Sequence, residues 1–120
     1  MNDRAKWVGA MRSLRFVLGY VAASDSEQSR ECTRAIEIAF LTASILKPRN
    51  EPSDSGRAKI ALKSAMDATQ SAYWLSRFEK QIILTCLIHA GNMLAEVAKE
   101  RWRKLAEQLR DEAGKKEIEG

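Results

Sequence analysis

Cysteine, histidine and proline are scarce in this 120-residue chain, and each shortage excludes a class of protein. Two cysteines, Cys32 and Cys86, are too few for the disulfide framework of a small secreted domain. The single histidine, His89, leaves too few ligands for a zinc site, which needs about three or four. With two prolines, 45% hydrophobic residues and 30% charged residues, the chain belongs to the globular class.

A long hydrophobic run is also missing from the sequence. The longest uncharged segment, residues 81–95, has 15 residues. A membrane-spanning helix needs roughly 20 apolar residues. The N-terminal stretch makes a poor export signal, because its flank is long and Gly19 interrupts its apolar part. We therefore expect a cytoplasmic protein without a membrane span.

Signatures of catalysis are absent as well. The sequence contains no glycine-rich phosphate loop and no Glu-x-x-His pair of a di-iron bundle. Cys86, His89 and Asn92 follow one another at three-residue steps and are the residue types of a cysteine-protease site. In the middle of a helix, however, the N–H groups are already bonded and cannot form an oxyanion hole. We interpret Cys86 and His89 as core or semi-core packing residues and predict no enzyme activity, no cofactor and no metal.

Cap residues and prolines predict two helices in the first half of the chain. The first covers residues 3–22, with Asn2 or Asp3 as its cap. The second covers residues 24–47 and begins with the Ser-x-x-Glu spacing of a capping box at Ser24. The proline that follows it stops the helix, because the residue before proline is pushed out of the helical region.

The second half of the chain predicts two more helices. The segment that follows the second proline is too long to form one straight helix within a compact bundle. A second capping box, Ser76 and Glu79, gives the best break, so we expect helices over residues 54–75 and 77–113. The predicted fold is all-α, a four-helix bundle with mostly antiparallel neighbours and a long last helix. Residues 1–113 form its single domain, and residues 114–120 are expected to be a disordered charged tail.

The uncharged segment is predicted to be the buried middle of the last helix. Two neighbouring stripes on it are expected to lie against other helices: Ile82, Cys86, His89 and Met93 on one, and Ile83, Leu87, Ala90 and Leu94 on the other. The second predicted helix also carries two apolar stripes, one of them made of Ile38, Leu41 and Ile45. We therefore expect that helix to be central.

A basic face on the first helix suggests one possible function. The net charge is +4, and Arg4, Arg12 and Arg15 share one quadrant of the helix. Basic residues of the third helix, Arg57, Lys59 and Lys63, are expected to extend this surface. No helix-turn-helix signature accompanies it. Binding of nucleic acid through this face is therefore our alternative prediction.

The end of the last helix suggests the function that we favour. Trp102, Leu105 and Leu109 form an apolar stripe that should extend beyond the other helices. We predict that it contacts another protein or a second copy of the chain, with a homodimer preferred. A kink near Gly91 that folds the stripe back onto the bundle is the competing arrangement. The predicted protein is a non-catalytic helical interaction module, such as a small bacterial accessory, inhibitor or immunity-type protein.

Overall fold

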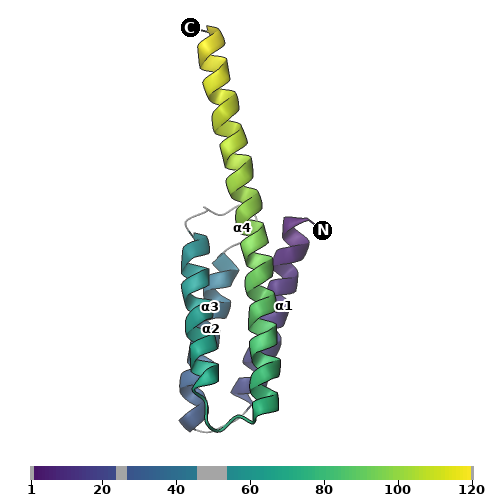
Figure 1. Ribbon diagram of the computed structural model, residues 1–120, viewed down its shortest axis with the longest axis vertical. Helices are drawn as coiled ribbons and strands as arrows, with labels where there is room; N and C mark the ends of the chain where they lie inside the picture. The colour runs from purple at the N-terminus through teal and green to yellow at the C-terminus, as the bar shows by residue number, and fades with distance from the viewer. Residues whose placement is uncertain (1, 24–26, 46–53, 120) are drawn as a thin grey trace.

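The computed structural model describes residues 2–23, 27–45 and 54–119 of the chain. Within these ranges the side chains of residues 3, 28, 45, 54–55, 101–102 and 116–119 are left undescribed. The described residues form four helices and no strand: α1 (Asp3–Ala22), α2 (Glu27–Ile45), α3 (Asp54–Gln70) and α4 (Arg77–Glu119). Each helix runs antiparallel to the next, and α4 returns beside α1 (Figure 1). The predicted all-α bundle with a long last helix is confirmed.

The caps explain where two of the helices begin. The Asn2 side chain accepts a hydrogen bond from the Ala5 amide at 2.8 Å, so Asn2 is the cap of α1. At the start of α4, the Ser76 amide donates to Glu79 Oε1 at 3.0 Å, and the Glu79 amide donates to Ser76 Oγ at 3.1 Å. This capping box is the predicted one. Ser24, the predicted cap of the second helix, lies outside the described residues.

Two helix ends differ from the prediction. Helix α3 ends at Gln70 rather than at residue 75, because the chain turns there: the Ala72 amide donates to the Thr69 carbonyl, and the Leu75 amide donates to the Ala72 carbonyl. Helix α4 continues to Glu119, so residues 114–119, predicted to be a disordered tail, are helical. Nothing in this segment prevents a helix, since it contains no proline.

The core lies between the four helices and is built from aliphatic side chains and alanine. Its largest fully buried side chains include Leu14, Ile36, Ile83 and Leu87, one or two from each of α1, α2 and α4. Buried alanines on α2 and α3 let these two helices approach closely. Near the C-terminal end of α2, the Trp7 indole N–H donates to the Ala43 carbonyl at 3.0 Å and connects α1 to α2.

Two predicted buried stripes are only partly buried. The stripe of Ile83, Leu87, Ala90 and Leu94 is confirmed as core, whereas Ile82 is 41% exposed, His89 is exposed, and Cys86 and Met93 are half-buried. The prediction that His89 is a core residue is therefore wrong. On α2, Ile38 and Leu41 are exposed, so α2 is no more central than the other helices. The physical reason is the same in both cases: each helix of the ring packs against two neighbours and turns its outer face to solvent.

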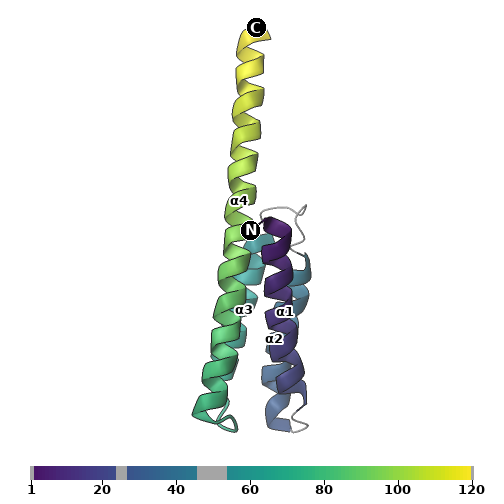
Figure 2. The ribbon, with the colours of Figure 1, turned by 90° about the vertical axis from the view of Figure 1, so that its right-hand side faces the viewer.

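Helix α4 determines the elongated shape of the molecule. The molecule measures 66 × 23 × 18 Å, and the longest dimension follows α4. Figure 2 shows α4 leaving the bundle at the end where the N-terminus lies and continuing without a bend. Because α4 is a single helix from Arg77 to Glu119, it passes through Gly91 unbroken. The kink that would have folded its end back onto the bundle is absent.

Candidate protein-interaction surface

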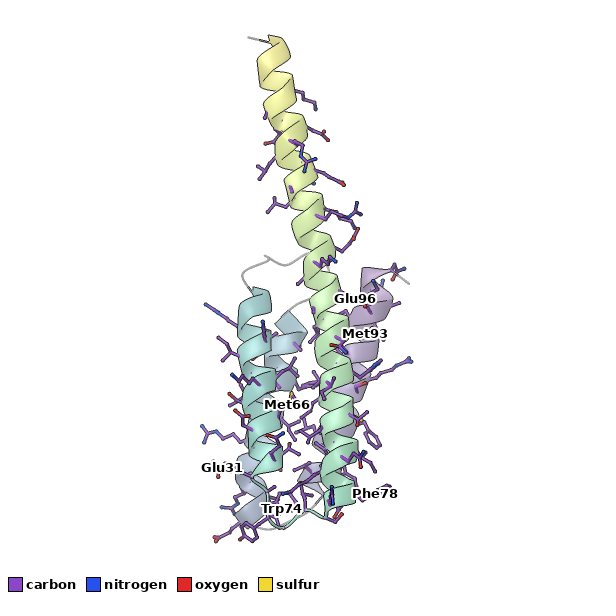
Figure 3. All side chains as sticks on the ribbon, viewed as in Figure 1. Glu31, Met66, Trp74, Phe78, Met93 and Glu96 are labelled. Atoms are coloured by element: carbon purple, nitrogen blue, oxygen red, sulfur yellow. The ribbon has the colours of Figure 1, made fainter. Side chains whose placement is uncertain are left out.

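The projecting part of α4, residues 100–119, is called the arm below. The last contacts between α4 and α1 come just before it: Lys6 Nζ lies 3.0 Å from a carboxylate oxygen of Glu96, and Val97 is buried. Figure 3 places Glu96 on the side of α4 that faces α1, and no other helix lies beside the arm above it. The charge of Lys6 still reaches Glu100, the first residue of the arm. Beyond Glu100 no helix of the described bundle lies beside the arm.

The predicted partner-binding residues lie on this arm. Leu109 is 57% exposed and Leu105 is half-buried. The side chain of Trp102 lies outside the described residues, although its backbone belongs to α4. The spacing of three and four residues places all three positions on one face of the helix. An exposed leucine on a helix that nothing covers is the kind of apolar surface that binds another protein.

Ion pairs hold another face of the arm. Arg103 donates to both carboxylate oxygens of Glu100, and its Nη1 atom lies 3.0 Å from Glu107 Oε1. The hydrogen bond from Arg103 lowers the pKa of Glu100 below its ordinary value. Pairs at three- and four-residue spacing support an isolated helix locally. The arm is thus stabilised by its own charges as well as by continuity with the bundle.

A groove between α3 and α4 was not predicted from the sequence. It encloses about 650 Å³, and its lining includes Leu62 and Met66 of α3 and Gly91, Ala95 and Ala98 of α4. Three lysines, Lys59, Lys63 and Lys99, line it as well, and no acidic residue is among the described residues that line it. The signal in the sequence was the run of small residues on α4, because glycine and alanine leave an open channel where larger side chains would fill it.

The basic residues of α1 lie where the sequence placed them. Arg4, Arg12 and Arg15 are all exposed, and none pairs with an acidic residue of the described chain. The Arg15 guanidinium sits over the Phe40 ring of α2 at 5.8 Å from its centre. The expected extension of this face is wrong, because α1 packs against α2 and α4, and the lysines of α3 line the groove against α4 instead.

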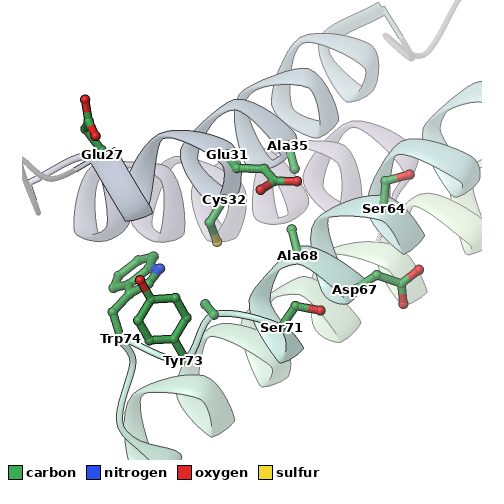
Figure 4. Close-up of a pocket in the computed structure, with 11 residues that line it drawn as sticks. Glu27, Glu31, Cys32, Ala35, Ser64, Asp67, Ala68, Ser71, Tyr73 and Trp74 are labelled. Carbon is green, nitrogen blue, oxygen red and sulfur yellow. The ribbon is translucent and has the colours of Figure 1, made fainter.

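A second pocket, of about 560 Å³, opens between α2 and α3 (Figure 4). Glu31 and Asp67 lie on its two walls, and Tyr73 and Trp74 close one end. Cys32 is buried at its base, where burial raises the pKa of the thiol. Cys32 Sγ lies 3.8 Å from the hydroxyl oxygen of Thr69. A protonated, buried thiol is a poor nucleophile, so the pocket provides no activated cysteine.

The histidine of α4 lies on its outer side, and its cysteine packs at the edge of the core. Cys86 is half-buried, and His89 and Asn92 are exposed, all within the helix and without a free N–H group nearby. In the part of the chain that the structure describes, no three histidine, cysteine or acidic residues gather closely enough to hold a metal ion. The outer side of α4 therefore offers no constellation for catalysis among the described side chains.

Helix α4 is also long and apolar enough to cross a membrane, by length and composition alone. Its most apolar window of 18 residues has a mean hydropathy of 1.3, and 28% of that window is buried inside the bundle. Core helices of soluble proteins meet the same criterion. Ile83, Leu87 and Leu94, which lie in this part of α4, pack against the other helices. The absence of a membrane span and the cytoplasmic location stay predictions.

Comparisons with known proteins place the chain in no family. No protein-family model matches it, and neither the curated proteins nor the solved structures contain a significant match.

Proposed function

We propose that this chain is a non-catalytic helical protein-interaction module that binds its partner through the apolar face of the arm. One observation carries the proposal: α4 leaves the bundle without a break and takes the Leu105 and Leu109 face with it, and Leu109 is 57% exposed. Because the arm extends away from the other helices, nothing in the described chain covers this face.

Physical chemistry supports a partner on this face. A helix of about 20 residues without tertiary contacts is only marginally stable in water, so a covering helix would stabilise the arm. Burying a leucine side chain contributes roughly 1.5–3 kcal/mol before the costs of association. The stripe therefore supplies a useful share of a binding free energy and has no role in the isolated bundle.

The test replaces Leu105 and Leu109 with glutamate. We expect the double variant to stay helical and to keep the melting temperature of the dilute wild-type chain, because both positions lie outside the bundle. We also expect it to size as a monomer by light scattering where the wild type self-associates, or to lose a partner that the wild type retains as bait. The control, Ser64→Glu with Ser71→Glu, adds the same charge at exposed positions away from the arm.

Two results would show that the proposal is wrong. If the variant unfolds while the wild type is a monomer, Leu105 and Leu109 are part of the chain's own core. A loss of association in the control variant as well would mean that added negative charge, and not the stripe, is responsible.

The alternative from the sequence, nucleic-acid binding through Arg4, Arg12 and Arg15, stays a prediction. Their exposure and lack of acidic partners in the described chain are compatible with phosphate contacts. The basic residues are nevertheless divided between this face and the groove, whereas phosphate binding needs them gathered on one surface. The arm therefore supports the better-founded function.

A further inference from the structure

The face of α4 that lines the groove and the face of the arm that carries the leucines are one continuous stripe. Its positions follow one another at steps of four, three, four, three and four residues: Gly91, Ala95, Ala98, Trp102, Leu105 and Leu109. The first three are small and line the groove. The last three are large and belong to the arm. The first half of this stripe thus carries small side chains, and its second half carries large ones.

The two halves match when a second α4 lies antiparallel to the first. A two-fold axis at residue 100 places Leu109 of one copy opposite Gly91 of the other, and Leu105 opposite Ala95. The same operation places Trp102 opposite Ala98. Every large position then faces a small one, which is the condition for two helices to interlock closely.

We propose that the partner is a second copy of this chain, and that the arm of each copy lies in the groove between α3 and α4 of the other. This inference rests on the proposed function and identifies the partner that the arm binds. A Cβ atom added at Gly91 would lie 3.7 Å from Leu62 Cδ1, an ordinary van der Waals contact, so Gly91 faces Leu62 of α3. Leu62 and Met66 of α3 form the remaining apolar wall.

The size of the surface is adequate for a stable dimer. The arm stripe alone covers about two heptads, a short contact for a pair of helices. The stripe from Gly91 to Leu109 adds the groove, which has 13 lining residues. Together with the arm, each copy contributes close to the 20 or so residues of a standard interface. Because both halves occur on every copy, the contact closes on itself and does not propagate into fibres.

The charges agree with the same register. Leu62 lies against Gly91, so Lys63 of α3 is level with about residue 90 of α4. The two-fold axis brings Glu112 of the other copy opposite residue 88, within about one helical turn of Lys63. Glu112 and Lys63 are both exposed in the single chain. The docked arm thus brings an acid to a groove whose described lining residues include none.

Cysteine cross-linking tests the register directly. Ala95→Cys and Leu105→Cys are combined in a chain that also carries Cys86→Ser, since Cys32 is buried and Cys86 is not. The new cysteines lie about 15 Å apart along one helix, too far for an internal disulfide. Mild oxidation should convert most of the chain into a covalent dimer. The matched control, Ala95→Cys with Leu109→Cys, is displaced by one turn and should cross-link at least about tenfold more slowly.

A size exchange tests the same contact without cysteine. Ala95→Leu changes an exposed side chain, leaves the single bundle folded and sets two leucines against each other in the dimer. It should weaken the dimer roughly tenfold or more by sedimentation, a loss of the size that one poor contact causes. Adding Leu105→Ala to the same chain restores a large residue opposite a small one, and the dimer should return.

The outcomes separate this inference from the proposed function. Cross-linking of the 95 and 105 pair together with rescue by the size exchange supports it. A wild type that dimerises but shows neither result overturns the groove docking, while the arm as interface survives if Leu105→Glu with Leu109→Glu still gives a monomer. Efficient cross-linking of Ala95→Cys alone means parallel helices and overturns it too. A wild type that is monomeric at every concentration overturns the choice of partner.

Discussion

Helix α4 belongs to two regions that share one pattern and differ in what surrounds it. In the bundle, its apolar positions are covered, and Leu87 is 1% exposed. In the arm, the same spacing of three and four residues continues, yet Leu109 is mostly exposed. The comparison teaches that periodicity identifies the contact face of a helix but not the chain that covers it. Cover within the same chain gives a core, and cover from another chain gives an interface.

The two regions also differ in what holds the helix. The bundle part is stabilised by burial against α1 and α3. The arm relies on short-range pairs such as Arg103 with Glu100 and Glu107, which are exposed to solvent. The bundle should therefore unfold cooperatively, whereas the arm should fray from its end.

The largest expected effect comes from truncating a leucine in each region. Leu87→Ala should lower the free energy of unfolding by about 2–5 kcal/mol, because it opens a cavity in the core. Leu109→Ala should change that of the monomer by less than about 0.5 kcal/mol, as an exposed position does. Urea unfolding of dilute protein measures both. Equal losses would erase the distinction between bundle and arm.

A smaller effect is expected at the opposite end of α4, where Glu79 joins two helices. Glu79 caps α4 and accepts a hydrogen bond from the Tyr20 hydroxyl of α1. The bonds from Tyr20 and Ser76 lower the pKa of Glu79. A lowered pKa in the folded state gives stability that is present above the unfolded pKa and is lost as the pH falls through the folded value.

We therefore expect Glu79→Gln to reduce the stability of the chain at neutral pH. In this variant the melting temperature should also depend less on pH in the acid range, below the ordinary pKa of 4.5. The pKa of Tyr20 is raised by the same bond, so its contribution persists at neutral pH and is lost in alkali. Thermal melts from acid to neutral pH provide the measurement. Tyr20→Phe, which keeps the cap, should reduce this pH dependence of the melting temperature only partly. An unchanged pH dependence in Glu79→Gln would show that Glu79 does not cause it.

The smallest effect concerns the arm alone. Arg103→Gln removes the ion pairs with Glu100 and Glu107, and should raise amide exchange in the arm a few-fold while leaving residues 77–99 protected. High salt should reproduce part of this effect in the wild type, because exposed pairs are screened. Faster exchange throughout α4 would mean that bundle and arm unfold as one unit.

Much of the fold was predictable because local chemistry determines it. The Asn2 cap and the Ser76 and Glu79 box are short-range signals, and both form as expected. The end of α3 was missed because Ala72 and Leu75 are buried in a turn with the spacing of a helix. His89 was misplaced because the sequence does not reveal how many neighbours a helix has. The arm stripe was predictable from its large residues, whereas the groove depends on side chains that are small, and a pattern of apolar residues does not reveal empty space.

Because α4 is unbroken, it also fixes the angle between its core face in the bundle and its apolar face in the arm. Helix α4 carries the core face and the arm face on one rigid rod, so the direction in which the arm presents its leucines is determined by the number of residues between them. One inserted residue would turn the arm by about 100° and move it by about 1.5 Å. Lengths that differ by about seven residues keep nearly the same direction, since seven residues make almost two turns. The number of residues between the core face and the arm face thus sets the angle at which the molecule holds a partner.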